Sequence, residues 1–271
     1  MIYTDTSGLE ALIVKIREVS GFDFSGYARA SLMRRTKVYL EKNKITLPRL
    51  LANINPETSD AYEIIQGLTV NYSEMFRDPD FFKCLKSDVF GYLESYASPR
   101  VWVAGCASGE EAFSLSIFLK EAGLPDQPMI YATDISQRVL SLARDGIFSL
   151  AGIRGFSENY LQAGGTSSLS DYYSVSYNHA VIHHEIRKNI VFAVHDLTGD
   201  SVFNEFQMIC CRNVMIYFNA EQRKKVLKLL HDSLSMFGFL CLGKREWLRY
   251  SGMEENFRIV NESLNIYQKI Q

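Results

Sequence analysis

The sequence predicts an α/β protein in which an all-helical N-terminal domain precedes a mostly parallel, doubly wound sheet that carries a small antiparallel β insertion. Apolar residues recur at three- and four-residue spacing up to about residue 70, as they do on buried helix faces. Short β-rich runs alternate with helical stretches after Pro99, which is typical of parallel strands joined by helices. A stretch that begins with two glycines interrupts this alternation near residue 165.

Length and composition limit the protein class. The chain has 271 residues, 47% hydrophobic and 22% charged, with a formal net charge of -2. This length suits one large domain and one small one, and the near-neutral charge gives no drive toward nucleic acid. The N-terminal residues lack the pattern of a signal peptide, and no apolar run reaches the roughly 18 residues of a membrane span. We therefore expect a cytoplasmic protein without membrane insertion.

The N-terminal domain is expected to cover residues 1–75. Ser7 and Glu10 form a capping-box pattern, and one apolar helix face follows, made of Leu9, Leu12, Ile13, Ile16 and Val19. Further helices are expected at residues 27–44, 48–53 and 59–67.

The second domain, residues 76–271, is expected to alternate strands with helices. The strands are expected at 101–105, 129–134, 190–194, 207–212 and 239–243, the helices at 110–122, 137–145 and 220–235, and one or two final strands at 258–270. The insertion, at about 163–188, begins with Gly164 and Gly165 and alternates through Tyr173, Val175, Tyr177, Val181 and Ile182. This pattern indicates a hairpin between the second and third strands of the main sheet.

Cysteines and histidines give no metal pattern. The five cysteines are odd in number and show no C-x-x-C spacing: Cys84, Cys106, Cys210, Cys211 and Cys241. We expect buried free thiols. The histidines His183, His184 and His195 have no ligand spacing with these cysteines, so no metal site is expected.

A glycine turn follows the first strand. The run VWVAGCASGEEAFSL, residues 101–115, places Gly105 and Gly109 between a strand and a helix, where a nucleotide-like ligand can approach the backbone. The spacing differs from the G-x-G-x-x-G dinucleotide fingerprint, which disfavours a nicotinamide-dependent dehydrogenase. A tight turn kept only for packing is the alternative interpretation.

An acidic residue ends the second strand. Asp134 lies beside the glycine turn, where a carboxylate accepts both hydroxyl hydrogens of a ribose. Alternatively, Asp134 caps the helix that starts near Ser136. The turn and the acid together indicate an adenosine site.

Four sequence blocks resemble the CheR-type chemoreceptor glutamate methyltransferases. They are NYSEMFRDPDFF (71–82), AGCASGEEAFSL (104–115), YATDIS with VLSLARDGIF (131–148), and CRNVMIYF (211–218) closed by FLCLGKRE (239–246). The pair Arg34 and Arg35 adds a weaker likeness. The resemblance spans nearly the whole chain. It implies a helical N-terminal domain, a Rossmann-like methyltransferase domain with a β-subdomain, S-adenosyl-L-methionine as cofactor and S-adenosyl-L-homocysteine as product.

The resemblance also implies roles for individual residues. The implied cofactor-binding residues are Asn71, Ser73 and Arg77 at the methionyl part, Glu111 and Asp134 at the amino group and ribose, and Asp196, Leu197, Arg212 and Asn213 around the adenine, beside the turn at Gly105. The implied catalytic residues are Arg77 and Tyr217, which face the transferred methyl group. Without the resemblance, Arg77 is read as half of a surface ion pair and Tyr217 as a core residue.

The implied reaction needs few catalytic groups. A glutamate side chain with a pKa of about 4.3 is already ionised at neutral pH, so its methylation requires no general base. Orientation alone supplies about 7 to 11 kcal/mol of barrier reduction. The alternative is a regulatory or scaffold protein that binds the cofactor without turnover. Retention of Arg77, Glu111, Asp134 and Tyr217 disfavours it.

A basic segment indicates the partner. Residues 26–44 hold six basic residues against the single acid Glu41: Arg29, Arg34, Arg35, Lys37, Lys42 and Lys44. We expect an acidic helical segment of a chemoreceptor-like protein to dock here, on Arg29, Arg34, Arg35 and Lys37. A solvated helix face is the alternative interpretation.

Overall fold

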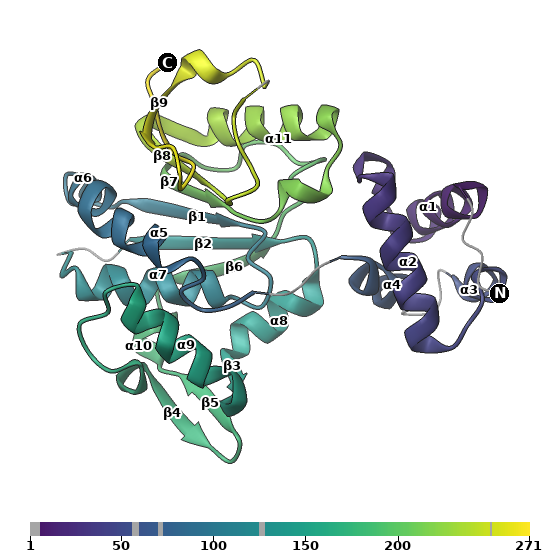
Figure 1. The fold of residues 1–271 in the computed structure, drawn as a ribbon, viewed down its shortest axis with the longest axis horizontal. Helices are drawn as coiled ribbons and strands as arrows, with labels where there is room; N and C mark the ends of the chain where they lie inside the picture. The colour runs from purple at the N-terminus through teal and green to yellow at the C-terminus, as the bar shows by residue number, and fades with distance from the viewer. Residues whose placement is uncertain (1–5, 56–59, 70–72, 125–127, 250) are drawn as a thin grey trace. The chain divides into compact units, whose positions relative to one another are not determined.

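The computed structural model describes residues 6–55, 60–69, 73–124, 128–249 and 251–271 (Figure 1). These residues form two compact units. The helical unit holds the described residues of Met1–Asn71 together with Tyr217–Arg223, and the sheet unit holds those of Tyr72–Ile216 and Lys224–Gln271. The domain boundary expected after residue 75 stays a prediction.

Four helices build most of the helical unit. They are α1 (Thr6–Ser20), α2 (Arg29–Asn43), α3 (Leu47–Asn53) and α4 (Asp60–Leu68), with the 3-10 turn η1 (Phe24–Gly26) after α1. The predicted helices are thereby confirmed. The residues Leu9, Leu12, Ile13 and Ile16 are at most 4% exposed, which confirms the apolar face of α1. Because α1 begins at Thr6, Ser7 lies inside the helix and not at the N-cap position that the predicted capping box requires.

A segment distant in sequence completes the helical unit. The backbone N–H of Ala28 donates to the carbonyl of Tyr217 at 2.8 Å, and Tyr27 and Phe218 form an antiparallel bridge. The rings of Tyr27 and Phe218 meet edge to face, with 5.3 Å between centroids. Residues just before α2 therefore hold the backbone of Tyr217 and the ring of its neighbour Phe218 in place.

Seven strands form the main sheet, in the order β6-β2-β1-β7-β8-β10-β9. Their bounds are β1 (Arg100–Ala104), β2 (Met129–Asp134), β6 (Ile190–Val194), β7 (Phe206–Cys211), β8 (Leu234–Leu242), β9 (Phe257–Asn261) and β10 (Ile266–Lys269). The first five strands in this order pair in parallel, whereas β10 runs antiparallel to β8 and β9. The predicted mostly parallel sheet is confirmed.

Helices precede the first strand and connect the later ones. In chain order they are α5 (Pro79–Cys84), the π-helical η2 (Leu85–Val89), α6 (Phe90–Leu93), α7 (Glu110–Glu121), α8 (Gln137–Asp145), α9 (Leu150–Gln162), α10 (His184–Arg187) and α11 (Ala220–Ser233), with 3-10 turns η3 (Leu169–Tyr172), η4 (Met215–Tyr217) and η5 (Glu254–Asn256). Of the described helices, none has the length and apolar character needed to cross a membrane.

Strand β1 is buried on both faces, which explains why its sequence is a continuous apolar run. Val101 and Val103 enter the core that α7 covers, while Trp102 between them contacts His195 and Phe203 on the opposite face. All five cysteines are buried with free thiols, as the sequence predicts.

Two parts of the main domain differ from the predicted spans by more than a few residues. The helical run from α5 to α6 was not predicted, although Phe81, Phe82 and Leu85 bury one face of it. Strand β8 begins at Leu234, where helix was expected to continue to residue 235, because Leu234 pairs with Phe206 before a bulge in the ladder. Tertiary pairing overrides the helical pattern there.

The insertion is a three-stranded antiparallel sheet in the order β3-β5-β4, formed by β3 (Ile147–Ser149), β4 (Tyr173–Ser176) and β5 (His179–Ile182). The β4–β5 hairpin confirms the antiparallel insertion between β2 and β6. The third strand, β3, lies before the predicted start at residue 163. Gly164 and Gly165 follow the end of α9 and do not open a hairpin, because Ala163 is the C-cap of α9.

Candidate active site

Polar side chains gather at one edge of the sheet. Strands β6, β2, β1 and β7 run parallel, so their carboxyl ends meet at a common edge, where ligands of open α/β sheets bind. The predicted residues that end these strands or follow them are Gly105, Asp134, Asp196, Leu197, Arg212 and Asn213. The fold therefore collects them on one side of the sheet unit.

The turn after β1 requires glycine. Gly105 has φ 75° and Gly109 has φ 92°, in the left-handed region that L-residues avoid. A Cβ at Gly109 would lie 2.9 Å from the Phe113 ring. The N–H of Gly105 donates to the carbonyl of Thr133 at 2.8 Å, which ties the turn to the end of β2. The turn thus has a steric reason for its glycines and lies against the strand that carries Asp134.

The Asp134 carboxylate spans two backbone turns. Its Oδ2 accepts the N–H of Ala107 and its Oδ1 accepts the N–H of Ser136, each at 3.0 Å. The N-cap of α8 is Ser136, whose hydroxyl accepts the N–H of Val139, so Asp134 is not the cap residue. Each carboxylate oxygen keeps a second lone pair, enough for two hydroxyl donors. Burial raises the pKa of Asp134. The hydrogen bonds from backbone N–H groups lower the pKa by less, so the net shift is upward.

Arg212 joins three separate segments. Its side chain is 2% exposed and forms ion pairs with Glu111 at 2.6 Å and Asp78 at 2.8 Å. It also lies over the Phe81 ring, with 3.9 Å from guanidinium carbon to centroid. Burial lowers the pKa of Arg212, and the two carboxylates outweigh burial and raise it. A guanidinium paired in this way stays charged and fixes the end of β7 to α7 and to the start of α5.

The segment that carries Arg77 is constrained on both sides. Phe76 and Asp78 have φ values of 56° and 58°, which is a rare conformation for a bulky aromatic residue. Phe76 is fully buried, and its N–H donates to the Ser114 hydroxyl at 2.8 Å. Asp78 also pairs with Lys244 at 2.7 Å. Arg77, half-buried between two anchored neighbours, is therefore presented by a backbone with little freedom.

A buried carboxylate holds the loop after β7. Glu246 is 4% exposed and accepts backbone N–H groups from Asn213 (2.6 Å), Met215 (2.6 Å), Ile216 (3.3 Å) and Gly243 (2.7 Å). These donors engage both carboxylate oxygens, which suits the ionised form. Burial raises the pKa of Glu246, and the four N–H groups oppose that shift. Glu246 is the physical link between the CRNVMIYF and FLCLGKRE blocks.

Asp196 and Leu197 follow β6. The Asp196 carboxylate accepts the N–H and the hydroxyl of Thr198 at 2.8 and 2.7 Å, which closes a local turn. Leu197 is buried next to it. Just before them, the N–H of His195 donates to the carbonyl of Asp134 at 3.2 Å. The turn after β6 is therefore attached to the strand end that holds Asp134.

The other predicted residues belong to segments that do not follow these strands in the sequence. Ser73 and Arg77 belong to the segment that leads into α5. Asn71 lies outside the described residues. Tyr217 belongs to the helical unit, where its ring lies under the Arg35 guanidinium. The cofactor and catalytic roles of these residues stay predictions.

Sequence reasoning missed Asp78, Lys244, Glu246 and the role of Glu110. The first three stand inside the NYSEMFRDPDFF and FLCLGKRE blocks. Their place in these blocks was therefore the only sequence signal for them. Glu110 is 6% exposed; its Oε1 accepts the Ser108 hydroxyl at 2.7 Å, and its Oε2 is buried without a hydrogen-bond partner. Burial raises the pKa of Glu110.

The donor set fits the cofactor that the resemblance implies. S-adenosyl-L-methionine carries a ribose diol, an ammonium group and a sulfonium group. The spare lone pairs of Asp134 match the diol, and the unpartnered Glu110 oxygen beside the glycine turn matches a cation. Within the described part of the chain, no group of His, Cys, Asp and Glu residues is arranged to hold a metal ion.

Comparison with known proteins identifies the family. Residues 71–266 match the family model described as CheR methyltransferase, SAM binding domain. The chain is 38% identical over 262 residues to Cher3 of Pseudomonas putida, covering 96% of this chain and 94% of that protein. It is 30% identical over 234 residues to a chemotaxis protein methyltransferase of Listeria innocua, covering 83% and 84%. The chain belongs to the CheR family of S-adenosylmethionine-dependent methyltransferases.

Proposed function

We propose that the protein transfers the methyl group of S-adenosylmethionine to glutamate side chains of a chemoreceptor-like protein in the cytoplasm, giving glutamate methyl esters and S-adenosylhomocysteine. The observation that carries this proposal is the constrained backbone at Arg77, whose carbonyl accepts a hydrogen bond from the Arg212 guanidinium at 3.3 Å beside the Arg212–Glu111 ion pair. A positive group there suits an acceptor that is a carboxylate. The Listeria innocua relative bears the name chemotaxis protein methyltransferase, which supports the same substrate class.

The proposed reaction is an in-line displacement. The bound cofactor supplies an electrophilic methyl group whose departure leaves a neutral thioether. One oxygen of the acceptor carboxylate forms the new bond to carbon as the carbon–sulfur bond breaks, and no proton is transferred. Arg77 binds and orients the acceptor carboxylate, and Tyr217 donates a hydrogen bond to it. Asp134 and Glu111 hold the reactant in place, so catalysis comes mainly from orientation.

The docking surface is proposed on α2. Arg34, Lys37, Lys42 and Lys44 are exposed, and they suit an acidic helical segment. Two residues of the predicted surface have partly buried contacts: Arg29 pairs with Glu10 at 2.9 Å, and Arg35 donates to the carbonyl of Leu68 at 2.9 Å. Lys37 forms only an exposed ion pair, with Glu41 at 3.9 Å. The exposed cations are therefore the better candidates for docking.

The docking proposal is tested by charge reversal. Arg34→Glu combined with Lys37→Glu should raise KM for the acceptor protein and make activity less sensitive to salt, because screening acts over about 8 Å at physiological ionic strength. Affinity for S-adenosylmethionine should stay unchanged. The matched control is Arg154→Glu on α9, whose side chain is 89% exposed. An unchanged KM and salt dependence would exclude this surface.

The proposed activity is tested with methyl-labelled S-adenosylmethionine and the purified cytoplasmic fragment of a chemoreceptor. Base-labile label on the receptor, released as methanol at high pH, is the expected result, because esters hydrolyse in base whereas N-methyl groups do not. Replacement of the accepting glutamates by glutamine should remove the label. Cofactor binding without any transfer would overturn the proposal and indicate a regulatory protein that binds the cofactor.

A further inference from the structure

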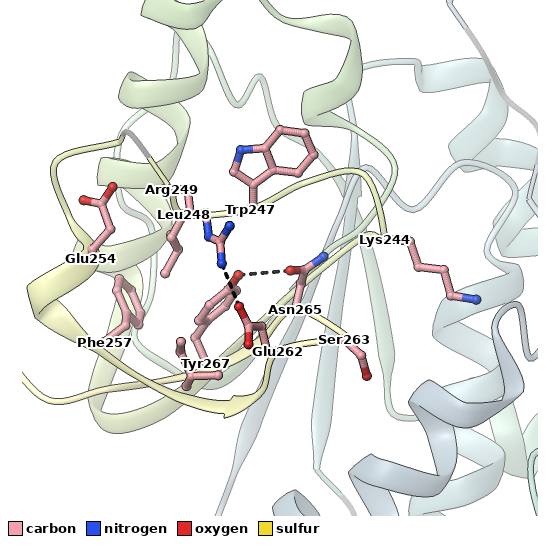
Figure 2. A pocket seen from close by; sticks show the side chains of 11 residues that line it. Lys244, Trp247, Leu248, Arg249, Glu254, Phe257, Glu262, Ser263, Asn265 and Tyr267 are labelled. Carbon is pink, nitrogen blue, oxygen red and sulfur yellow. Dashed lines mark hydrogen bonds and ion pairs between the residues drawn. The ribbon is translucent and has the colours of Figure 1, made fainter.

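A cavity of about 530 Å³ opens beside the β9–β10 hairpin (Figure 2). Phe257 of β9 and Tyr267 of β10 line it and are only 6% and 7% exposed. The loop after β8 contributes Trp247 and Arg249, and Glu262 follows β9. This volume lies within the range of about 300 to 1,000 Å³ that is usual for ligand pockets. None of these residues belongs to the predicted cofactor site.

Three aromatic side chains line the cavity: Trp247, Phe257 and Tyr267. Trp247 is 48% exposed, so one part of its indole is open to an incoming group. The hydroxyl of Tyr267 donates to Asn265 Oδ1 at 3.1 Å, which fixes the ring. Burial raises the pKa of Tyr267, so its phenol stays neutral. Aromatic faces grouped around a cavity attract cations, since each ring presents negative charge on its face.

Two carboxylates and two cations line the cavity: Glu254, Glu262, Lys244 and Arg249. Lys244 pairs with Asp78 at 2.7 Å, outside the cavity, whereas Arg249 pairs with Glu262 of the lining itself.

The structure already seats a guanidinium in this environment. Arg249 Nη2 lies 2.8 Å from Glu262 Oε1, and Figure 2 marks this pair with a dashed line beside Tyr267. The Arg249 and Glu262 side chains are 72% and 68% exposed, and ion pairs this exposed contribute little to stability. Arg249 is therefore an occupant that another cation can replace at small cost.

We propose that this cavity binds a basic side chain, a guanidinium or an ammonium group, of the methyl-accepting protein, in exchange for Arg249. Lys244 lines the cavity and pairs with Asp78, the residue after Arg77, so the cavity adjoins the segment at which transfer is proposed. A basic residue near the methylated glutamate would then help to select the acceptor. Only the identity of the partner rests on the proposed function; binding of a basic side chain does not.

Trp247 provides a direct readout, because the other tryptophan, Trp102, is fully buried. The full-length protein is titrated with Nα-acetyl-arginine amide, Nα-acetyl-lysine amide and, as a neutral control, Nα-acetyl-norleucine amide. We expect a saturable change in tryptophan emission with at least one basic probe, and comparison of the two separates guanidinium from ammonium recognition. The change should be absent in Trp247→Phe. Equal binding of the norleucine probe would overturn the proposal.

Two substitutions should act in opposite directions. Arg249→Ala removes the internal occupant and should tighten binding of the basic probe about two- to fivefold, whereas Glu262→Gln should weaken it by a similar factor. The matched control Glu255→Gln is exposed, neighbours the cavity in sequence and does not line it, so it should change nothing. Insensitivity to both Arg249→Ala and Glu262→Gln would overturn the proposal.

Receptor methylation then tests the partner. Glu262→Gln should raise KM for the receptor fragment and leave kcat and cofactor affinity unchanged, because the cavity is proposed to bind the acceptor and not the cofactor. An unchanged KM would exclude the acceptor as the source of the basic side chain. If no transfer occurs even with the unsubstituted chain, the proposed function fails, whereas the probe titration still decides whether the cavity binds a cation.

Discussion

The guanidinium of Arg35 lies over the ring of Tyr217, with 4.4 Å between the guanidinium carbon and the ring centroid. The same guanidinium donates to the carbonyl of Leu68 at the end of α4 at 2.9 Å. Arg35 therefore connects α2, α4 and the Tyr217–Arg223 segment within the helical unit. A residue expected from sequence to face a partner is engaged inside its own unit, and it supports the side chain that the resemblance places at the methyl group.

Arg35→Leu should destabilise the protein by about 1 to 3 kcal/mol, since it removes a cation–π contact and a hydrogen bond from a charged donor. Arg34→Leu, one residue away and exposed, is the matched control and should cost less than about 0.5 kcal/mol. Urea denaturation followed by circular dichroism measures both. Equal effects of the two substitutions would contradict the bracing role of Arg35.

Glu246→Gln should lower the free energy of unfolding by about 2 to 4 kcal/mol. Four backbone N–H groups donate to the two carboxylate oxygens of Glu246, whereas a glutamine amide offers only one acceptor oxygen. The loop that holds Asn213 should loosen, so affinity for S-adenosylmethionine should also fall. Denaturation and calorimetry give the two values. Glu94→Gln, at an exposed position, serves as control, and a Glu246→Gln variant with unchanged stability and affinity would refute the anchoring role.

Asp78→Asn should make the protein less stable at neutral pH but not in acid. Burial raises the pKa of Asp78, but its bonds to Lys244 and Arg212 outweigh burial and hold the pKa below 3.8. A carboxylate whose pKa is lower in the folded state stabilises the fold above pH ~3.8 and loses that contribution as the pH falls through its folded-state pKa.

The measurement for Asp78 is the difference in unfolding free energy between Asp78→Asn and the unsubstituted chain, from pH 7 down to pH 3. The difference should shrink at the acid end. Asp80→Asn, whose partner Lys83 is exposed, is the control and should show little difference at any pH. A constant difference across the range would show that the Asp78 charge does not matter.

Asp134→Ala should lose about 1 to 3 kcal/mol of S-adenosylmethionine binding, because two hydroxyls are left without their acceptor. Calorimetry measures the loss, with Asp145→Ala at an exposed position of α8 as control. Affinity in the unsubstituted chain should also fall as the pH is lowered through the pKa of Asp134, which burial raises above 3.8, because the ionised form accepts both hydroxyls. Equal affinities of the two variants would disprove the ribose assignment.

Arg77→Ala should lower kcat for receptor methylation by roughly 10- to 100-fold, which corresponds to the loss of one charge-assisted hydrogen bond to the acceptor. The melting temperature should change little, because the neighbours Phe76 and Asp78 and not the Arg77 side chain hold the segment. Lys83→Ala on α5 is the control. A folded Arg77→Ala variant with full activity would remove Arg77 from the catalytic site.

The local elements followed from the sequence because their causes are local. The bounds of β2, α8 and β6 were predicted to the residue, since apolar period and flanking turn residues mark each one. The Gly105 turn and Asp134 were also found from sequence, because glycines between a strand and a helix and an acid at the next strand end need only neighbouring residues to be recognised. Strand β3 and the early start of β8 were missed because they form only by pairing with distant segments.

Only the tertiary structure decided which charged groups meet. Arg212 pairs with Asp78 and Glu111 across 134 and 101 residues of chain, and Glu246 reaches Asn213 across 33. No periodicity predicts such pairs, because packing of separate elements decides which carboxylate a buried guanidinium or N–H group reaches. Arg35 is the same case: composition made it part of a basic surface, whereas packing placed it on Tyr217. The sequence by itself therefore determined the local elements and the residue types that they carry. Tertiary packing decided which charged groups pair, because packing removes each buried charge from water and a buried charge needs a partner of opposite charge or a hydrogen bond.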